Sequence, residues 1–297
     1  MSSSVTSVSA SESGQVQGAE VKDQSIGAII SASRNLSAEQ VEKILAYQRS
    51  QGVRFGEAAV SLGFASTDDV LFALSQQFHY PYAPVEHARI NPELVTLTHP
   101  FSPQAEAFRA TRSQLMMRFY NGTEPQALAV VSPASGDGKT YFCANLAVSL
   151  AQLGGRTLLV DADLRGPRQH ELFGLNNSEG LSAVLSGRAT GQVIQQIATV
   201  PSLFVMPVGV TPPNPLELVE RPAFGLLMRE FLTKFDHVIV DTPAASFGAD
   251  SHVVAARCGA ALVIARRNET RVAALQELVA TFEQSPAKLL GVIVNEF

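Results

Sequence analysis

The sequence has few cysteines, no excess of basic residues and no long apolar run. Cys143 and Cys258 are the only cysteines among 297 residues, which excludes a disulfide framework and indicates a reducing cytoplasm. The net charge of −5 argues against nucleic-acid binding. No apolar stretch approaches the length of a membrane span, and the first residues are polar, unlike a signal peptide. We therefore expect a cytoplasmic protein that is peripheral to a membrane only through a partner.

A glycine-containing segment, residues 132–140, is the strongest functional signal that the chain does have. It reads Ser-Pro-Ala-Ser-Gly-Asp-Gly-Lys-Thr and follows a short apolar run, which is typical of a strand that opens into a phosphate-binding loop. Gly136 and Gly138 would let backbone N–H groups approach phosphate oxygens at the start of the next helix. Lys139 would supply a positive charge to the β and γ phosphates, and the Thr140 hydroxyl would bind Mg²⁺.

Two further apolar runs, residues 158–160 and 238–240, end in carboxylates. The first is followed by Asp161 and Asp163, and the second by Asp241. Because the carboxyl ends of parallel strands meet at one edge of a sheet, we expect these side chains beside the phosphate loop. Mg²⁺ prefers oxygen ligands and can lie between carboxylate and phosphate. The pattern therefore predicts a nucleotide and Mg²⁺ site, although a single aspartate of this kind would be more typical of a strand-end turn.

Composition divides the chain into four parts. Residues 1–24 are rich in Ser, Gln and Glu without periodicity and are expected to be a disordered tail. Residues 25–82 are expected to form a small helical domain. Residues 83–104 carry four prolines and are interpreted as an extended linker. Residues 105–297 contain the phosphate loop and alternate apolar runs with amphipathic segments, which predicts an α/β P-loop NTPase domain with a mostly parallel sheet.

The expected helical domain contains an internal repeat. A shift of 29 positions aligns Ile26-Gly27 with Phe55-Gly56 and Ser37 with Ser66. Each half then corresponds to a short helix, a turn and a second helix, with Ser37 and either Ser66 or Thr67 as N-caps. The repeat resembles the N-terminal domain of type II secretion ATPases. That resemblance favours a protein-docking role, and binding of cyclic di-GMP, as in some relatives of that domain, is the alternative.

The segment from about residue 98 onward resembles the bacterial tyrosine kinases of capsule and exopolysaccharide export, in particular the EpsG-type chain-length-determinant kinases. The order of several motifs carries the resemblance: Glu106-x-x-Arg109-x-x-Arg112, Ser132 to Thr140, Asp161-Ala162-Asp163-Leu164-Arg165, Pro212-Pro213-Asn214-Pro215, Asp241-Thr242-Pro243 and Gly291-Val292-Ile293-Val294-Asn295. The helical repeat in front of this domain also resembles the EpsG arrangement. The resemblance therefore covers nearly the whole chain.

The resemblance implies an ATP- and Mg²⁺-dependent protein-tyrosine kinase that works with an inner-membrane polysaccharide chain-length determinant. It implies catalytic roles for Lys139, Asp161, Asp163 and Asp241, with Asp163 positioning or deprotonating the attacking tyrosine. Thr140, Asp161 and Asp241 would hold the metal or its waters, and Asn295 would hydrogen-bond adenine. The implied nucleotide-binding set is Ser135, Gly136, Asp137, Gly138, Lys139, Thr140, Tyr141, Arg165 and Asn295.

The family also implies self-association and phosphorylated tyrosines. Glu106, Arg109 and Arg112 lie three residues apart, so they share one face of an expected helix over residues 105–118. The resemblance implies that this face builds a homo-oligomer, and a solvated charged face is the alternative. None of the five tyrosines lies near residue 297, so we expect the acceptor on a partner protein or at Tyr120, which is interpreted as accessible.

Two other functions remain open from the residues alone. ParA and MinD ATPases share the strand-end aspartates and use ATP to switch dimerisation. They require a lysine five residues before the phosphate-loop lysine, where this chain has Ala134. A non-catalytic ATP-binding regulator of polymer length is the second alternative, because every motif named above would also serve nucleotide binding without catalysis.

Overall fold

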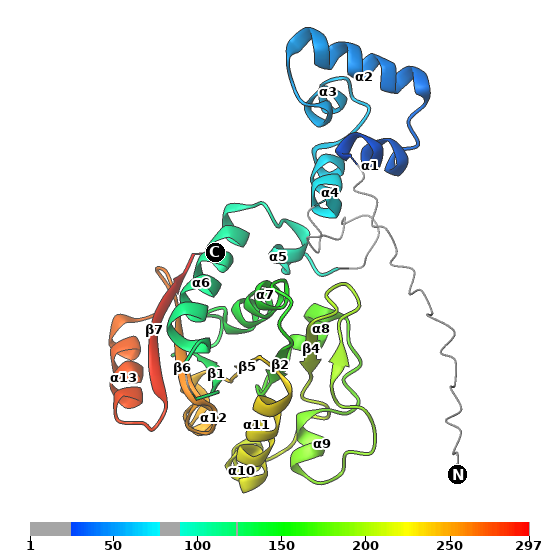
Figure 1. Ribbon diagram of the computed structural model, residues 1–297. Coiled ribbons are helices and arrows are strands. Elements are labelled where there is room, and N and C mark those ends of the chain that lie inside the picture. Colours follow the sequence, from blue (N-terminus) through cyan, green and yellow to red (C-terminus); the bar gives the residue numbers. More distant parts are fainter. Residues whose placement is uncertain (1–24, 78–89, 123, 297) are drawn as a thin grey trace, which may run out of the picture. The chain divides into compact units, whose positions relative to one another are not determined.

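The computed structural model describes residues 25–77, 90–122 and 124–296 (Figure 1). The chain divides into two compact units, Met1–Gln77 and Phe78–Phe297. The predicted tail over residues 1–24 lies outside the described residues, as do residues 78–89 at the predicted boundary between helical domain and linker. In the parts of the chain that are described, no helix combines the length and apolarity needed to cross a bilayer.

The first unit is helical, and its two halves repeat. It contains α1 Ile26–Ser33, α2 Ala38–Gln51, α3 Phe55–Ser61 and α4 Thr67–Gln77 (Figure 1). Ser37 caps α2 and forms a capping box with Gln40, and Ser66 makes the same kind of exchange with Asp69 ahead of α4. Both N-caps predicted from the repeat are confirmed. The small core between the helices contains Ile44, Ala58 and Ala59.

The glycines at equivalent positions of the repeat differ in their surroundings. A Cβ atom on Gly56 would lie 2.8 Å from Val70 Cγ1, whereas one on Gly27 would lie 3.4 Å from the nearest atom of Phe55. Gly56→Ala is therefore expected to lower the free energy of unfolding of this unit by about 1–3 kcal/mol, because the stiff Val70 side chain cannot move aside. Hydrogen exchange of the α3 and α4 amides in the full chain measures the effect. Gly27→Ala is the matched control and is expected to leave that exchange unchanged.

The second unit alternates strands and helices. Its strands are β1 Ala127–Val131, β2 Thr157–Asp161, β3 Gln195–Gln196, β4 Leu203–Met206, β5 His237–Asp241, β6 Gly259–Arg266 and β7 Lys288–Asn295. Its helices are α5 Val95–Thr98, α6 Pro103–Leu115, α7 Lys139–Ala151, α8 Gln169–Phe173, α9 Leu181–Leu185, α10 Pro215–Glu220, α11 Pro222–Lys234, α12 Asp250–Cys258 and α13 Val272–Glu283. The helix expected over residues 105–118 is α6, which continues into a π-helical turn, Met116–Tyr120.

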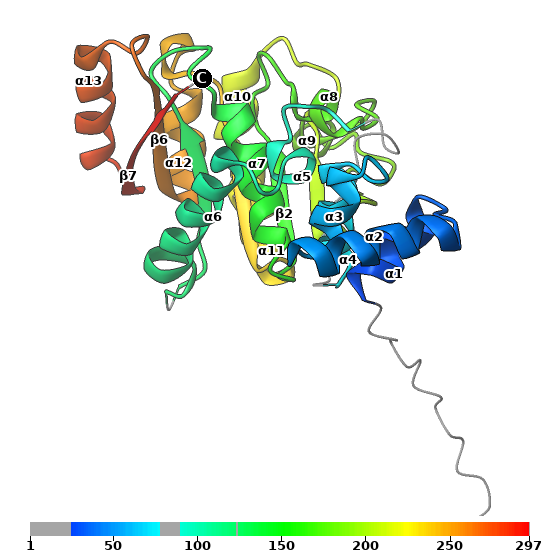
Figure 2. The same ribbon diagram turned by 90° about the horizontal axis from the view of Figure 1, so that it is seen from above.

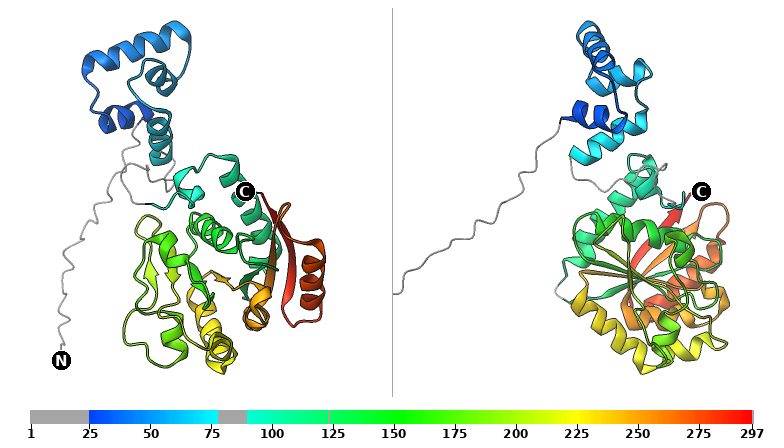
Figure 3. Two further views of the ribbon diagram at one scale, coloured as in Figure 1. Left: turned by 180° about the vertical axis from the view of Figure 1, so that it is seen from behind. Right: turned by 90° about the vertical axis from the view of Figure 1, so that its right-hand side faces the viewer.

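Within the described residues, the strands form one sheet in the order β3-β4-β2-β5-β1-β6-β7. All neighbours run parallel except β3, which is antiparallel to β4. The central strands β1, β2 and β5 are buried along their whole length, as their continuous apolar sequences predict. The right-hand view of Figure 3 shows the strands fanning out between the helices. The predicted α/β fold with a mostly parallel sheet is confirmed.

Helices cover both faces of this sheet (Figure 2). One hydrophobic core joins the strands to residues of α9, α10, α11, α12 and α13, and includes the fully buried Phe224 and Phe282. A second core, on the other face, joins them to α5, α6, α7 and α8. Because every parallel strand ends at the same edge, the loops after β1, β2, β5 and β6 meet there.

Residues 90–104 differ from the extended linker predicted for residues 83–104. They include α5, and Leu94 and Leu97 are buried in the core next to α7. The fully buried Asn145 of α7 accepts from the Thr96 backbone N–H at 3.1 Å and donates to the Glu93 carbonyl at 2.8 Å. The prolines of this stretch favour an extended linker, but its few apolar residues suffice to dock it against α7.

Candidate nucleotide and metal site

Side-chain hydrogen bonds fix the conformation of the loop between β1 and α7. Gly136 and Gly138 have φ angles of 88° and 95°, which strongly favour glycine. The Ser132 hydroxyl donates to the Ala134 carbonyl at 2.7 Å. Asp137 Oδ2 accepts from the Ala134 backbone N–H at 2.8 Å, and its Oδ1 accepts from the Thr270 hydroxyl at 2.7 Å. The Asp137 carboxylate therefore braces the loop, so its predicted contact with nucleotide would be made by its backbone N–H.

Lys139 is the first residue of α7 and is nearly buried, with 6% of its surface exposed. Its Nζ donates to the Ser132 hydroxyl at 2.9 Å, which holds the ammonium group over the loop. The lysine faces a cavity of about 650 Å³. The residues that line this cavity are Glu93, Ser135, Gly136, Gly138, Lys139, Thr140, Tyr141, Asp163, Gly166, Arg168 and Arg266. Six of the nine residues predicted to bind nucleotide are among them.

Asp161 and Asp241 end the neighbouring strands β2 and β5 at matching positions in the register, and both are fully buried. Asp161 accepts three backbone N–H groups: that of Asp163 at Oδ1, and those of Arg168 and Gln169 at Oδ2. Asp241 Oδ2 accepts from the Gln169 side-chain amide at 2.9 Å. The structure thus brings together the two carboxylates that the sequence predicts as metal ligands.

Burial raises the pKa of both carboxyl groups. For Asp161 the burial effect is the largest cause, and the negative charge of Asp241 raises its pKa further. For Asp241 burial again dominates, while the nearby Lys139 ammonium group acts in the opposite direction and the resulting pKa is about 6. Two buried carboxylates side by side with a single neighbouring ammonium group favour the binding of an additional cation.

The side chains present fit Mg²⁺. Asp241 Oδ1 is buried without a hydrogen-bond partner among the described residues, so it can coordinate a metal. The Thr140 hydroxyl contacts the Asp241 carboxylate. In the described part of the chain no group of three or more His, Cys, Asp or Glu side chains could hold a metal ion. Mg²⁺ commonly needs only one or two carboxylates together with hydroxyl, water and phosphate oxygens, and Thr140, Asp161 and Asp241 can supply the protein's share.

Asp163 lies on the loop after β2 and lines the cavity. Its Oδ1 accepts from the backbone N–H groups of Arg165 at 3.1 Å and Gly166 at 2.9 Å. These two bonds fix the carboxylate at the cavity wall, where it could meet an incoming hydroxyl group. The geometry is compatible with the role predicted for this residue.

Arg165 and Asn295 lie outside the lining of the cavity. The Arg165 guanidinium makes a two-pronged ion pair with Asp250 at the start of α12, with distances of 3.2 and 3.1 Å. Asn295 ends β7, and its Nδ2 lies 3.5 Å from the Asp137 carbonyl oxygen. Contacts of these two residues with nucleotide therefore stay predictions.

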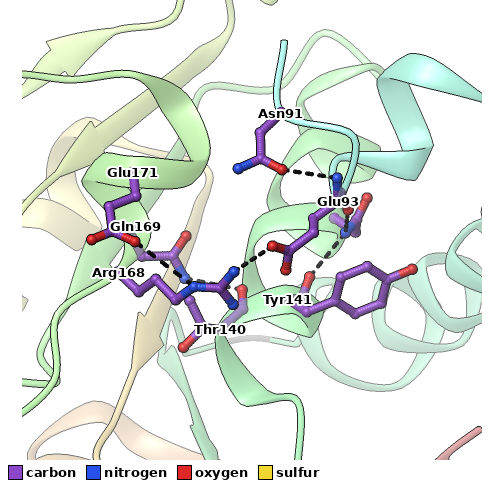
Figure 4. A network of polar contacts seen from close by, with 8 residues as sticks. Asn91, Glu93, Thr140, Tyr141, Arg168, Gln169 and Glu171 are labelled. Carbon is purple, nitrogen blue, oxygen red and sulfur yellow. Dashed lines mark hydrogen bonds and ion pairs between the residues drawn. The ribbon is translucent and has the colours of Figure 1, made fainter. Parts of the chain in front are cut away.

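Four residues of the site were not predicted from the sequence. Gln169 bonds both Asp241 and the Thr140 carbonyl, and Glu93, Arg168 and Arg266 line the cavity. Figure 4 shows Arg168 and Glu93 meeting in an ion pair beside Thr140 and Tyr141. Glu93 was hidden in the segment interpreted as a linker. Arg168 follows the Asp-x-Asp-x-Arg run by three residues, a spacing that could have suggested a second cation near the metal site.

Tyr141, which is predicted to bind nucleotide, and Tyr120, which is predicted to be an accessible acceptor, are both packed. The Tyr141 ring packs edge-on against Phe108, with 5.8 Å between the ring centroids. Burial raises the pKa of Tyr141, and the negative charge of Glu93 raises it further. Tyr120 was expected to be accessible, and this expectation is wrong. Its hydroxyl is buried without a hydrogen-bond partner in the described structure, its ring packs edge-on against His237, and burial raises its pKa well above the ordinary value.

The charged residues of α6 contact their own chain. Arg109 forms an ion pair with Glu106 at 2.6 Å and donates to the Pro100 carbonyl, while Arg112 donates to the Ser149 carbonyl at 2.8 Å. The Glu106 side chain is 68% exposed. The arginines therefore brace α6 within the subunit, and the predicted oligomer contact stays a prediction.

Comparisons with known proteins agree with this geometry. Residues 128–297 match the family model of the CobQ/CobB/MinD/ParA nucleotide binding domain. The putative tyrosine-protein kinase CapB of Staphylococcus aureus is 32% identical over 198 residues, which are 66% of this chain and 86% of that protein. This chain belongs to the bacterial tyrosine-protein kinase family. The kinase domain of Escherichia coli tyrosine kinase ETK is similar in structure, with a TM-score of 0.67 and 30% identity over 72% of this chain and 84% of that one.

Family members differ in how much of their length this chain matches. The tyrosine-protein kinase ptk of Acinetobacter johnsonii is 31% identical over 73% of this chain, but the match spans only 30% of that protein. The family resemblance predicted from the motif order is confirmed.

Proposed function

We propose that this chain is a protein-tyrosine kinase that uses ATP with Mg²⁺. The observation that carries the proposal is the buried, unpartnered Asp241 Oδ1 beside Thr140, within a site whose Lys139 faces the phosphate-loop cavity. A pure scaffold has no need of two adjacent buried carboxyl groups whose pKa values are both raised by burial. Membership of the tyrosine-kinase family supports the choice of reaction among those that P-loop proteins perform.

Each residue has a role that follows from its position. The phosphate loop and Lys139 bind and orient the phosphates, because Gly136, Gly138 and Lys139 all line the cavity. Asp163 positions the tyrosine hydroxyl or accepts its proton. Two backbone N–H groups fix its carboxylate at the cavity wall for this role. Bound Mg²⁺ would neutralise charge on the transferred phosphoryl group. Gln169 keeps Asp241 and the Thr140 turn in place through its amide group.

The proposed setting is exopolysaccharide production, with an inner-membrane chain-length determinant as partner. Such a partner would bring the cytoplasmic chain to the membrane surface. This part of the proposal rests on the resemblance of the motif order to the export kinases. We further propose that the helical repeat unit docks a protein; binding of cyclic di-GMP there is the competing outcome.

A single reaction mixture tests the function. The purified chain is incubated with Mg²⁺, ATP and the cytoplasmic segment of the candidate membrane partner, and phosphotyrosine and released phosphate are both measured. Phosphotyrosine that depends on the chain supports the kinase. ATP turnover without phosphotyrosine would support a MinD-like switch, and tight ATP binding with neither product a regulator of polymer length. Ala134, in place of the lysine that the switch proteins use, favours the kinase.

The proposed homo-oligomer has its own test at α6. Glu106→Lys reverses the charge of the exposed Glu106 side chain but leaves Arg112 bonded to Ser149, so the subunit is expected to stay folded. If Glu106 pairs with arginines of a neighbouring subunit, the variant is expected to reduce the assembly to monomers in light scattering at moderate salt. Glu230→Lys is the control, because Glu230 is also a helical glutamate and its side chain is 56% exposed. An unchanged mass for both variants would rule out this interface.

A further inference from the structure

Glu93 and Arg168 face each other at the wall of the phosphate-loop cavity. Their side chains form an ion pair, and both residues line the cavity together with Lys139 (Figure 4). Arg168 also lies 3.9 Å from Glu171 on the first turn of α8, a more distant contact. A carboxylate at this place is unfavourable for a site that binds phosphate, so the pair needs an explanation other than stability.

The backbones on both sides of the ion pair are fixed. The Arg168 N–H donates to the buried Asp161 Oδ2 at 3.1 Å, which ties the arginine to a proposed metal ligand. The Glu93 carbonyl accepts from the buried Asn145 of α7, and the Glu93 N–H donates to Asn91 Oδ1 at 3.0 Å. The two side chains themselves are partly exposed. Arg168 can therefore exchange its carboxylate partner for another anion in the cavity without any change of the fold.

The exchange of the Glu93 carboxylate for a phosphate group as the partner of Arg168 is favourable. The side chains of Arg168 and Glu93 are 45% and 36% exposed, and ion pairs of that exposure stabilise a protein only slightly. A guanidinium group binds phosphate through two parallel N–H donors, which is a stronger interaction. Bound nucleotide would also repel the Glu93 carboxylate. Phosphate therefore competes successfully for Arg168.

The strand order indicates which phosphate Arg168 meets. Arg168 follows β2, on the same loop as Asp163, whereas Arg266 and Asn295 end β6 and β7 on the other side of β1. If Asn295 marks the adenine end, Arg168 lies at the opposite end, where the terminal phosphate would face Asp163.

We infer that Arg168 is a ligand of the terminal phosphate of the bound nucleotide, and that Glu93 competes with that phosphate for the guanidinium group. Glu93 thereby weakens nucleotide binding, and Arg168 strengthens it. This inference rests on the proposed function, because it assumes that the cavity takes Mg²⁺ and ATP. It identifies two residues outside the phosphate loop that set the affinity for nucleotide: Arg168, which raises it, and Glu93, which lowers it.

The test is the affinity of the full chain for Mg²⁺-ATP and Mg²⁺-ADP, measured by calorimetry at low salt. Arg168→Met keeps the side-chain stem and removes the charge; it is expected to weaken ATP binding about tenfold and ADP binding much less. Glu93→Gln is expected to tighten ATP binding about threefold. The effect of Glu93→Gln should shrink when Arg168 is already replaced by methionine. The exposed pair Glu39 and Lys43 supplies the control, with Glu39→Gln and Lys43→Met expected to have no effect.

The outcomes separate this inference from the function on which it rests. If both variants shift the affinity in the same direction, or if Arg168→Met binds ATP as the parent does, the inference is wrong while the kinase proposal stands. If the folded parent chain takes up no Mg²⁺-ATP, both fail together. Thermal unfolding of each variant without nucleotide checks that the exposed substitutions leave the fold intact.

Discussion

Replacing Lys139 by alanine is expected to lower the rate of phosphotyrosine formation roughly a hundredfold to a thousandfold. The side chain is nearly buried, and its ammonium is held by Ser132 over the phosphate loop. It also lowers the pKa of Asp241, so its loss would favour the protonated, non-coordinating form of that carboxyl group. Both the phosphate contact and the metal site are therefore weakened. Rates of phosphotyrosine formation at saturating ATP, compared with the parent chain, measure the effect.

The control for this variant is Lys234→Ala. Lys234 lies in the last turn of α11 and pairs only with the exposed Glu230 among the contacts described, far along the sequence from the loop. The same charge is lost, so a non-specific effect of net charge would appear in both variants. Equal activity of Lys139→Ala and the parent chain would refute the role of the phosphate loop. Loss of activity in both variants would point to assembly or partner binding instead.

The central part of the fold could be predicted from the sequence because each signal is local. The continuous apolar runs before Asp161 and Asp241 are typical of buried strands, and parallel strands bring their carboxyl ends together. The two aspartates indeed stand in register. The strand β3, in contrast, is only Gln195–Gln196, and nothing in its polar sequence indicates a strand. Residues 195–196 form a strand because they pair with β4.

Parts of the site could not be predicted because they depend on contacts distant in the sequence. Gln169 reaches Asp241 across 72 positions, and Arg168 reaches Glu93 across 75. Asn145, in the middle of an apolar helix, gives no sign that it holds residues 93–96 in place. Tyr120 next to Asn121-Gly122 indicates an exposed turn, yet its ring turns inward against His237. Side-chain direction at the end of a helix is set by packing, which local sequence does not record.

The buried Asp241 is expected to make the free energy of unfolding depend strongly on pH. Folding raises the pKa of Asp241 from an ordinary value near 3.8 to about 6, so the folded chain binds a proton there more tightly than the unfolded chain. Without metal, the ionised Asp241 carboxylate therefore lowers the free energy of unfolding above about pH 6. This lowering disappears as the pH falls through 6 toward 4, because the carboxyl group becomes protonated. The adjacent Asp161 acts in the same direction. For the Asp241 shift alone the loss is on the order of 3 kcal/mol.

Asp241→Asn is expected to recover most of that stability at pH 8 and to abolish phosphotyrosine formation. The amide group has the shape of the carboxyl group but carries no charge, so the repulsion with Asp161 ends and metal coordination at Oδ1 is lost. Denaturant unfolding with a chelator at pH 5 and pH 8 measures the first effect. The exposed Glu277 of α13 supplies the control, because Glu277→Gln is expected to leave the pH dependence as it is. A parent chain more stable at pH 8 than at pH 5, or an Asp241→Asn variant that still responds to Mg²⁺-ATP as the parent does, would contradict the assignment of this carboxylate.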